Sequence, residues 1–246
     1  MHTRTTPSGP SALARKISIA NPLGPDDIGA LEAIQSETRS VPAKSDILRE
    51  GRAFDGPIVL RSGWVYSWKS LSDGRRQIVG FLLPGDLFGL FGHFPKPAPV
   101  SLSSLTPVEI ADISADALNS LLCRSPALTA AFAWMIERDM TELQEHVMRL
   151  GRMNARERTA HLLLELYHRL RAVGLVGDPH FRLPLSQVEL SDMLGLSGVH
   201  MNRTLRALRR EGLIDLQRRW ITIADLDRLK LLADFREQAF LGLRQS

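Results

Sequence analysis

The chain has 246 residues, of which 44% are hydrophobic and 24% are charged, a composition that indicates a folded protein with a core and excludes a disordered one. Its 31 lysines and arginines exceed its 27 acidic residues, and the net charge of +4 permits a polyanionic partner without requiring one. The single cysteine, Cys123, excludes an intramolecular disulfide and a cysteine-rich metal or iron–sulfur site, and its leucine neighbours predict a small buried side chain. No apolar run reaches the roughly 20 residues that a bilayer-spanning helix needs, so we expect a cytoplasmic protein without a membrane partner.

The N-terminal half begins with a polar stretch. Residues 1–24 lack the uninterrupted apolar core of a secretory signal, and we expect them to form a flexible tail. Acidic residues open the next segment, which favours a short helix there because the N-terminus of a helix attracts negative charge.

From about residue 41 to 113 the chain alternates short β-rich runs with turn residues, such as SDG at 72–74 and PGD at 84–86. Trp64, Tyr66 and Trp68 recur at every second position, as the residues of one face of a strand do. Several short strands at this spacing predict an antiparallel, jelly-roll-like β-roll, which we assign to a sensor domain over residues 25–125.

A long helical segment follows the strands. Its apolar residues are spaced 4, 3, 4 and 3, and the positions between them are almost entirely polar: Ile136, Met140, Leu143, Val147 and Leu150. This narrow stripe predicts a dimerisation helix over residues 126–151 that joins two copies of the chain about a two-fold axis. An ordinary amphipathic helix that lies on the roll remains the alternative.

The C-terminal domain, assigned to residues 152–246, contains clear helix boundaries. Ser186 and Glu189 have the spacing of a capping box, and Gly195 suits the left-handed position that follows a helix. Ser197 can cap the next helix after this short connection, which predicts a helix-turn-helix unit. The alternating segment 213–223 then predicts a small hairpin, a wing, with Arg218 and Arg219 at its tip.

The second helix of this unit has two distinct faces. Met201, Leu205 and Leu208 form a buried stripe, and the opposite face carries Val199 and three arginines at positions 203, 206 and 210. In a helix-turn-helix this helix enters the major groove of double-stranded DNA. Valine can contact a thymine methyl group, asparagine can pair with adenine and arginine with guanine, so the residues expected to read bases are Val199, Asn202 and Arg203. The residues expected to contact phosphates are Ser186, Ser197, His200, Arg206, Arg218 and Arg219.

Three stretches of the chain carry a resemblance to a known family: GWVYSWKSLSDGRRQIVGFLLPGDLFGL, the long helix, and LPLSQVELSDMLGLSGVHMNRTLRALRREGLI. With these the chain resembles the Crp/Fnr family of bacterial transcription regulators over nearly everything after the tail. The resemblance implies an α+β protein with an N-terminal cyclic-nucleotide-binding-like β-roll, a long dimerisation helix and a C-terminal winged helix-turn-helix. It also implies a homodimer on a palindromic operator, with RNA polymerase as a candidate partner.

The chain departs from the family where cyclic nucleotides bind. Members that respond to them hold the ribose with a glutamate after a Phe-Gly pair, and here Leu90 follows Phe88-Gly89. Between Arg76 and Arg124 the only basic residue is Lys96, so the roll offers no arginine to the cyclic phosphate. A buried phosphate without a cationic partner costs several kcal/mol. We therefore predict that cyclic AMP does not bind in the usual way.

The nature of an effector, and whether one exists, stays open at the level of the sequence. The expected pocket lining is apolar: Leu87, Phe88, Gly89, Leu90 and Phe91. His93 lies in the region where a haem-binding relative carries an axial histidine, but a packing or surface role is the simpler interpretation. We expect no cofactor and no metal.

Two other classes of function fit the sequence less well than a DNA-binding regulator. An effector-sensing or protein-interaction module whose winged domain does not read DNA would have little reason to present Asn202 and Arg203. An enzyme is not expected, because no nucleophile, histidine and carboxylate occur at a recognisable spacing and no glycine-rich phosphate loop follows a strand.

Overall fold

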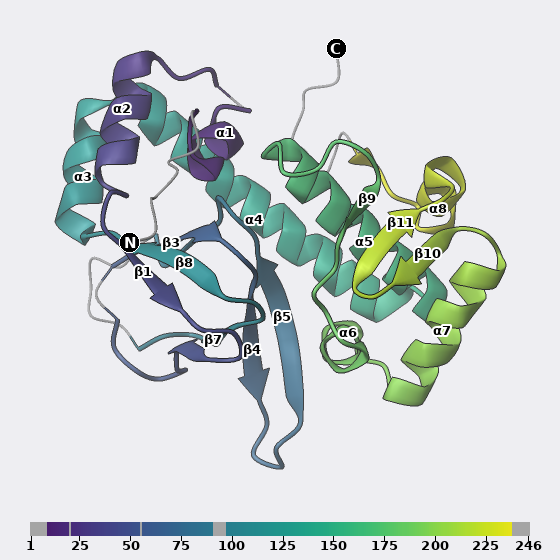
Figure 1. Ribbon diagram of the computed structural model, residues 1–246. Helices are drawn as coiled ribbons and strands as arrows, with labels where there is room; N and C mark the ends of the chain where they lie inside the picture. The colour runs from purple at the N-terminus through teal and green to yellow at the C-terminus, as the bar shows by residue number, and fades with distance from the viewer. Residues whose placement is uncertain (1–8, 20, 55, 91–96, 238–246) are drawn as a thin grey trace, which may run out of the picture.

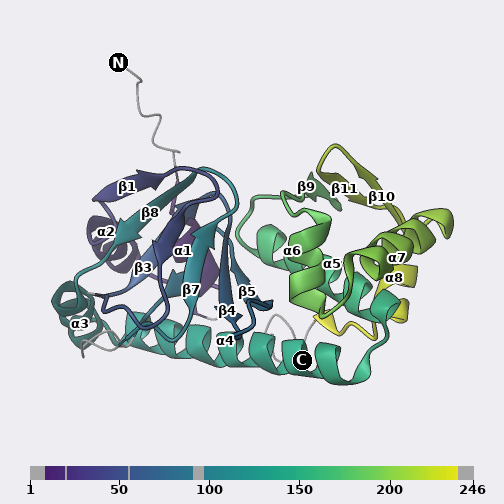
Figure 2. The ribbon, with the colours of Figure 1, turned by 90° about the horizontal axis from the view of Figure 1, so that it is seen from below.

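The computed structural model describes residues 9–19, 21–54, 56–90 and 97–237. An antiparallel β-roll forms the N-terminal half, and a unit of helices with a small sheet forms the C-terminal half (Figure 1). One long helix runs beneath both halves (Figure 2). The predicted α+β class and the order roll, long helix, winged helix-turn-helix are confirmed.

The roll consists of two four-stranded antiparallel sheets. The strand order in one sheet is β1 (Thr38–Val41), β8 (Val108–Asp112), β3 (Ile58–Ser62) and β6 (Leu87–Phe88). The order in the other is β2 (Asp46–Leu48), β7 (Ser101–Ser104), β4 (Val65–Ser70) and β5 (Arg76–Leu82). Apolar side chains from both sheets meet inside the roll, among them Val41, Ile58, Leu60, Val65, Leu102 and Ile110.

The outer face of β4 carries the aromatic stripe that the sequence predicts. Trp64 is buried, while Tyr66 and Trp68 are half-buried, and all three pack against the hydrophobic cluster shared with the C-terminal unit. The intervening Val65 and Ser67 are buried on the other side of the strand. The aromatic face therefore forms part of the contact between the two halves of the molecule.

Three helices cover one end of the roll: α1 (Ala12–Ile17), α2 (Pro25–Ala33) and α3 (Ala115–Arg124). The expectation of a flexible tail through residue 24 is wrong for α1, because Leu13 and Ile17 are completely buried in a cluster that includes Leu31, Leu128 and Phe132. Gly85 permits this packing. Its φ of +93° suits glycine, and a Cβ atom there would lie 2.7 Å from the backbone of Ala12. The six-residue α1 is too short to give a helical pattern in the sequence.

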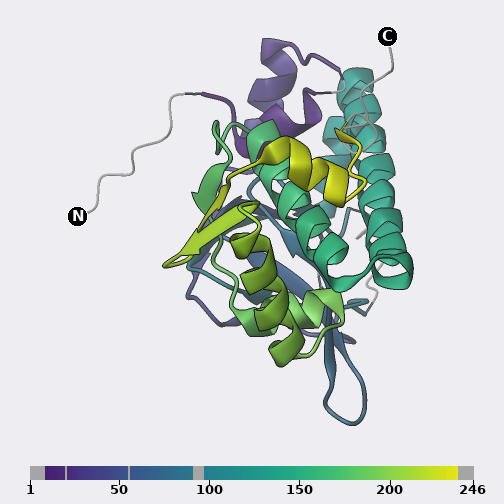
Figure 3. The ribbon, with the colours of Figure 1, turned by 90° about the vertical axis from the view of Figure 1, so that its right-hand side faces the viewer.

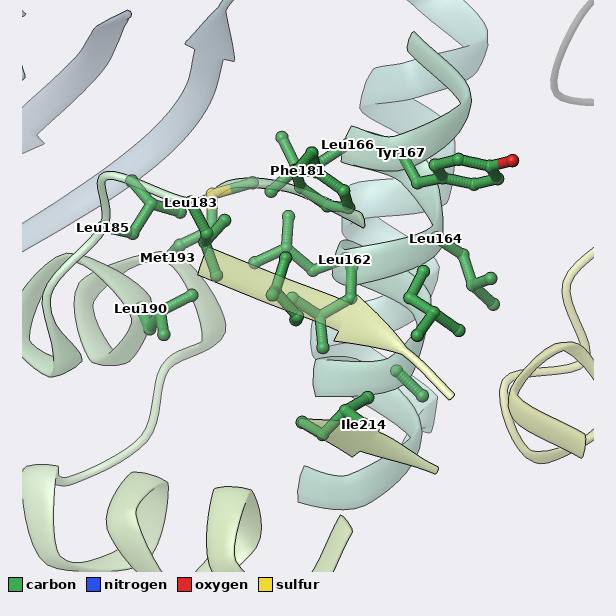
Figure 4. Close-up of a cluster of buried hydrophobic side chains, with 14 of the residues drawn as sticks. Leu162, Leu164, Leu166, Tyr167, Phe181, Leu183, Leu185, Leu190, Met193 and Ile214 are labelled. Carbon is green, nitrogen blue, oxygen red and sulfur yellow. The ribbon is translucent and has the colours of Figure 1, made fainter. Parts of the chain in front are cut away.

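Two helices link the halves. Helix α4 (Pro126–Arg152) is 27 residues long and begins at Ser125, whose hydroxyl accepts a hydrogen bond from the Leu128 amide. Helix α5 (Ala155–Ala172) follows at once, started by a capping box between Asn154 and Glu157. Leucines on α5 form the centre of the C-terminal core (Figure 4).

The C-terminal unit surrounds α5 (Figure 3). Its elements are β9 (His180–Arg182), α6 (Gln187–Leu194), α7 (Gly198–Arg210), β10 (Ile214–Gln217), β11 (Trp220–Ile223) and α8 (Leu226–Leu232). The helix-turn-helix and the wing hairpin are confirmed. The three-residue strand β9, which pairs with β11, was not predicted, because so short a segment has no alternation to detect.

One smaller expectation is wrong. Cys123 is exposed on α3 and not buried. Within the described residues, no helix combines the length and apolar character needed to cross a bilayer.

Candidate nucleic-acid interface

Hydrogen bonds at the ends of α6 and α7 fix the helix-turn-helix. The Ser186 hydroxyl accepts hydrogen bonds from the amides of Val188 and Glu189, and the Glu189 carboxylate accepts one from the Ser186 amide at 2.7 Å, which confirms the capping box. Gly195 ends α6 with φ at +62°. The Ser197 hydroxyl then caps α7 by accepting from the His200 amide at 3.3 Å. Both serine hydroxyls lie at helix N-termini, where anions are favoured.

Helix α7 is held by its apolar stripe. Met201, Leu205 and Leu208 are buried against the cluster built on α5, as the sequence predicts. This packing leaves the opposite face outward, and Val199 at its start is 76% exposed. The orientation of the exposed face therefore follows from the positions of three apolar side chains.

The exposed face of α7 carries arginines without acidic partners. Arg203, Arg206 and Arg210 form no ion pair with any residue that the structure describes, whereas Arg209 pairs with Asp215 at 3.6 Å. Glu211, the other acid of this region, pairs with Arg156. Together with Val199 and Asn202, the three unpaired arginines border an open groove of about 900 Å³. Three uncompensated guanidinium groups within about 11 Å of helix create a strong local positive charge.

Asn202 has a neighbour that sequence reasoning missed. Its Nδ2 donates a hydrogen bond to Oε1 of Gln187, the first residue of α6, at 3.2 Å. One amide hydrogen and Oδ1 of Asn202 stay available, and these are the groups that pair with adenine. The separation of 15 positions hides this pair in the sequence, since it forms only when α6 and α7 cross.

The wing places two more arginines beside α7. Arg218 and Arg219 form the two-residue turn between β10 and β11, with φ angles of +47° and +70°. Turns of this kind favour Asn-Gly because both residues are left-handed. Two arginines here carry backbone strain of about 1 kcal/mol or more each.

The residues predicted to line an effector pocket come together only in part. Leu87 and Phe88 border a cavity of about 200 Å³ between the roll and helices α4 and α5. Gly89 and the half-buried Leu90 lie in the roll outside this lining, with Gly89 against the Phe54 ring, while Phe91 and His93 lie outside the described residues. The expectation of an apolar lining is wrong, because charged side chains reach the cavity from the helices: Asp86, Asp139, Glu142, Arg149, Glu165 and Arg169.

Asp86 is at the centre of these charges. Its carboxylate accepts hydrogen bonds from Lys16 of α1 at 2.8 Å and from Arg169 of α5 at 2.5 Å. Burial alone would raise the pKa of Asp86, but the charges of Lys16 and Arg169 lower it to about 2, so it is ionised at neutral pH. By contrast, burial raises the pKa of the nearby Asp139 to about 6.

The two arginines of the cavity are already neutralised. Arg169 also contacts Glu142 at 3.2 Å and Glu165 at 3.3 Å, and Arg149 donates to Glu165 at 2.6 Å. A phosphate group entering the cavity would have to displace one of these carboxylates. Among the described residues, no group of histidine, cysteine and acidic side chains is arranged to hold a metal ion.

The predicted dimer seam lies on α4. Met140, Leu143 and Val147 are 53%, 49% and 64% exposed, whereas Ile136 and Leu150 are half-buried. A different face of the same helix packs on the roll through Leu128, Ala131, Phe132 and Met135. The helix therefore has one face that is covered by its own chain and one apolar stripe that is not.

Two family models match the chain, a cyclic nucleotide-binding domain over residues 38–125 and a Crp-like helix-turn-helix domain over residues 157–232. The nitrogen fixation regulation protein FixK of Bradyrhizobium diazoefficiens is 31% identical over 166 residues, which cover 68% of this chain and 69% of FixK. The transcriptional activator protein Anr of Pseudomonas protegens is 29% identical over 208 residues, 85% of each chain. The structure of FixK2 from Bradyrhizobium japonicum superposes with a TM-score of 0.70 at 28% identity, covering 80% of this chain and 96% of that one.

Replacing Arg203 by alanine should relax specificity at one position of each half-site and cost about 1–3 kcal/mol, because a lost pairing with guanine affects only the sequences that contain it. Binding measured against a panel of single-base variants checks this. Arg206→Ala serves as the control and should weaken binding to all sequences alike. A uniform loss for Arg203→Ala would assign that side chain to phosphate.

Replacing Arg218 and Arg219 by Asn and Gly should raise the free energy of unfolding by about 2 kcal/mol, because Asn-Gly accepts left-handed angles without strain. DNA affinity should fall equally for all sequences. The slope of the logarithm of the binding constant against the logarithm of the salt concentration should become less steep by about one for each phosphate contact that is lost. Denaturant unfolding and a salt titration measure the two effects. An unchanged salt slope would exclude the wing from the interface.

Proposed function

Because the chain belongs to the Crp/Fnr family and is a DNA-binding transcription regulator, we propose that it acts as a homodimer on a palindromic operator without a cyclic nucleotide. The observation that carries this proposal is a set of arginines on α7 and the wing that form no ion pair with any residue the structure describes: Arg203, Arg206, Arg210, Arg218 and Arg219.

In the proposed complex, the N-terminal half of α7 lies in the major groove. Val199, Asn202 and Arg203 face base edges, and the exposure of Val199 and Arg203 beside the half-buried Asn202 supports this role. Phosphates are contacted by helix-capping and basic residues at the periphery: Ser186, Ser197, His200, Arg206, Arg218 and Arg219. The helix N-termini capped by Ser186 and Ser197 add favourable backbone amides.

The dimer in this proposal forms along α4. The exposed stripe of Met140, Leu143 and Val147 has the narrow spacing of a two-stranded seam, and a second copy would cover it. Two helix-turn-helix units related by a two-fold axis recognise half-sites about one helical turn of DNA, 10–10.5 base pairs, apart. The names of relatives such as Anr, a transcriptional activator, support RNA polymerase as a further partner, and a regulator of chromosomal genes would act in the cytoplasm.

Independence from cyclic nucleotides is supported by two observations. Leu90 replaces the glutamate that the ribose would need, and the arginines near the roll are bound to carboxylates of the same chain. Burial of a phosphate there would therefore be unfavourable, because the phosphate would either lack a cationic partner or displace a carboxylate from its arginine.

Selection of bound sequences from a random DNA pool by the purified protein tests the proposed function. We expect enrichment of an inverted repeat without any added small molecule. A pool that stays random at modest ionic strength would contradict the proposal.

Replacing Met140 and Leu143 by glutamate should give monomers that bind the selected operator weakly, because charges in the seam repel across the two-fold axis. Sedimentation measures the mass. The control is Leu231→Glu, since Leu231 is 83% exposed on a different helix, α8. A dimer that survives the double substitution would remove α4 from the interface.

Titration of the wild-type protein with cyclic AMP in a calorimeter should give no binding heat, and titration of the same sample with operator DNA confirms that it is active. Tight binding of one cyclic AMP per subunit would refute independence from this nucleotide.

A further inference from the structure

The β4–β5 hairpin of the roll lies directly beside α6 (Figures 1 and 2). Arg76, at the start of β5, donates hydrogen bonds from Nε and Nη2 to Oδ2 of Asp192 at 2.9 and 2.5 Å. Its third nitrogen donates to the hydroxyl of Tyr66 at 3.1 Å. The guanidinium also lies 5.2 Å from the Tyr66 ring centre and 6.0 Å from that of Trp68, so aromatic rings of the roll hold it in place.

The neighbouring residue adds a second link to the same helix. Gln77 donates from Nε2 to the carbonyl oxygen of Met193 at 3.2 Å. From the other side, Arg158 of α5 donates to the carbonyl oxygen of Leu194 at 3.0 Å. The last turn of a helix has carbonyl groups without partners inside the helix, and here the roll and α5 satisfy two of them. The C-terminal end of α6 is thereby attached to the roll of its own chain.

Helix α6 is also attached to the side chains that face DNA. Only Gly195, Leu196 and Ser197 separate it from α7, and Gln187 at its start contacts Asn202. A change in the tilt of α6 would move the start of α7 and the amide of Asn202 together. The Arg76–Asp192 pair can therefore influence base recognition from outside the interface.

We propose that Arg76 of the roll is a positioning residue for DNA recognition, which acts through Asp192 to hold α6 at the angle that α7 needs in the major groove. The inference rests on the proposed function and deepens it, because it assigns to the roll a direct part in orienting α7 for DNA recognition. Both side chains are about a quarter exposed, so the pair is shielded enough to be stable and open enough to be altered without removing core packing.

Charge provides a sharp test. Arg76→Gln removes a positive charge and Asp192→Asn removes a negative one, so simple attraction to DNA would make the first variant bind more weakly and the second more tightly. Positioning predicts that both bind the operator more weakly, by about 3- to 30-fold, while binding to unrelated duplex changes little. The double variant Arg76→Gln/Asp192→Asn should lose no more than either single variant, because each substitution breaks the same pair.

Arg75→Gln is the matched control. Arg75 stands beside Arg76 in the same hairpin but is 77% exposed and pairs only with Asp73 among the described residues. We expect it to retain wild-type operator affinity. Equal losses for the Arg75 and Arg76 variants, tighter binding by Asp192→Asn, multiplied losses in the double variant, or wild-type affinity throughout would each overturn the inference.

Thermal unfolding shows whether each variant is folded at the assay temperature. If Arg76→Gln is not, Arg76→Lys makes the same test, because lysine keeps the charge but cannot bridge Asp192 and Tyr66 as a guanidinium does. Weaker operator binding with unchanged binding to unrelated duplex then supports the inference, and wild-type affinity overturns it. A wild-type protein that fails to distinguish any sequence contradicts the proposed function itself, whereas a discriminating wild type with unaffected variants contradicts only the role of Arg76.

Discussion

The buried carboxylate of Asp86 is the interaction on which the arrangement of the two halves depends. It lies in the turn before β6, and it meets Lys16 from α1 and Arg169 from α5 at hydrogen-bonding distance. A buried charge is tolerated only when it is paired, and removal of one partner from such a pair typically costs about 3–5 kcal/mol. Three segments far apart in the chain are thus required to stay together: the N-terminal helix, the roll and the central helix of the DNA-binding unit.

This attachment gives the roll a structural task that differs from holding a ligand. Arg169 reaches into the space between the roll and α4, where it also meets Glu142 and the carbonyl oxygen of Phe81. Elsewhere in the contact between the two halves, Arg76 of the β4–β5 hairpin pairs with Asp192 of α6. Two anchors, one buried and one partly exposed, fix the winged unit against the roll, and the orientation of the exposed side chains of α7 depends on this support.

The features that the sequence predicts are those that depend on neighbours a few residues away. The two faces of α7, the caps at Ser186 and Ser197, and the stripe on α4 each follow from a spacing of three or four residues. The features that it misses depend on contacts between distant segments. Asp86 and Arg169 are 83 residues apart, and the residues next to either one do not indicate that the two side chains form an ion pair. The contact between Gln187 and Asn202 is likewise not visible in the sequence. The burial of α1 is not visible either, because it depends on the close approach of the Ala12 backbone to Gly85.

The uninterrupted course of α4 beneath both halves has a consequence for the kind of DNA that the proposed dimer tolerates. A flexible connection between α4 and the DNA-binding unit would let each unit follow half-sites at different separations. DNA-binding units that are held against α4 and the roll cannot do so, since one inserted base pair shifts the second half-site by about 3.4 Å and rotates it by roughly 36° around the duplex. Spacer length, as much as base identity, then becomes a criterion by which genuine target promoters are separated from chance matches in a genome.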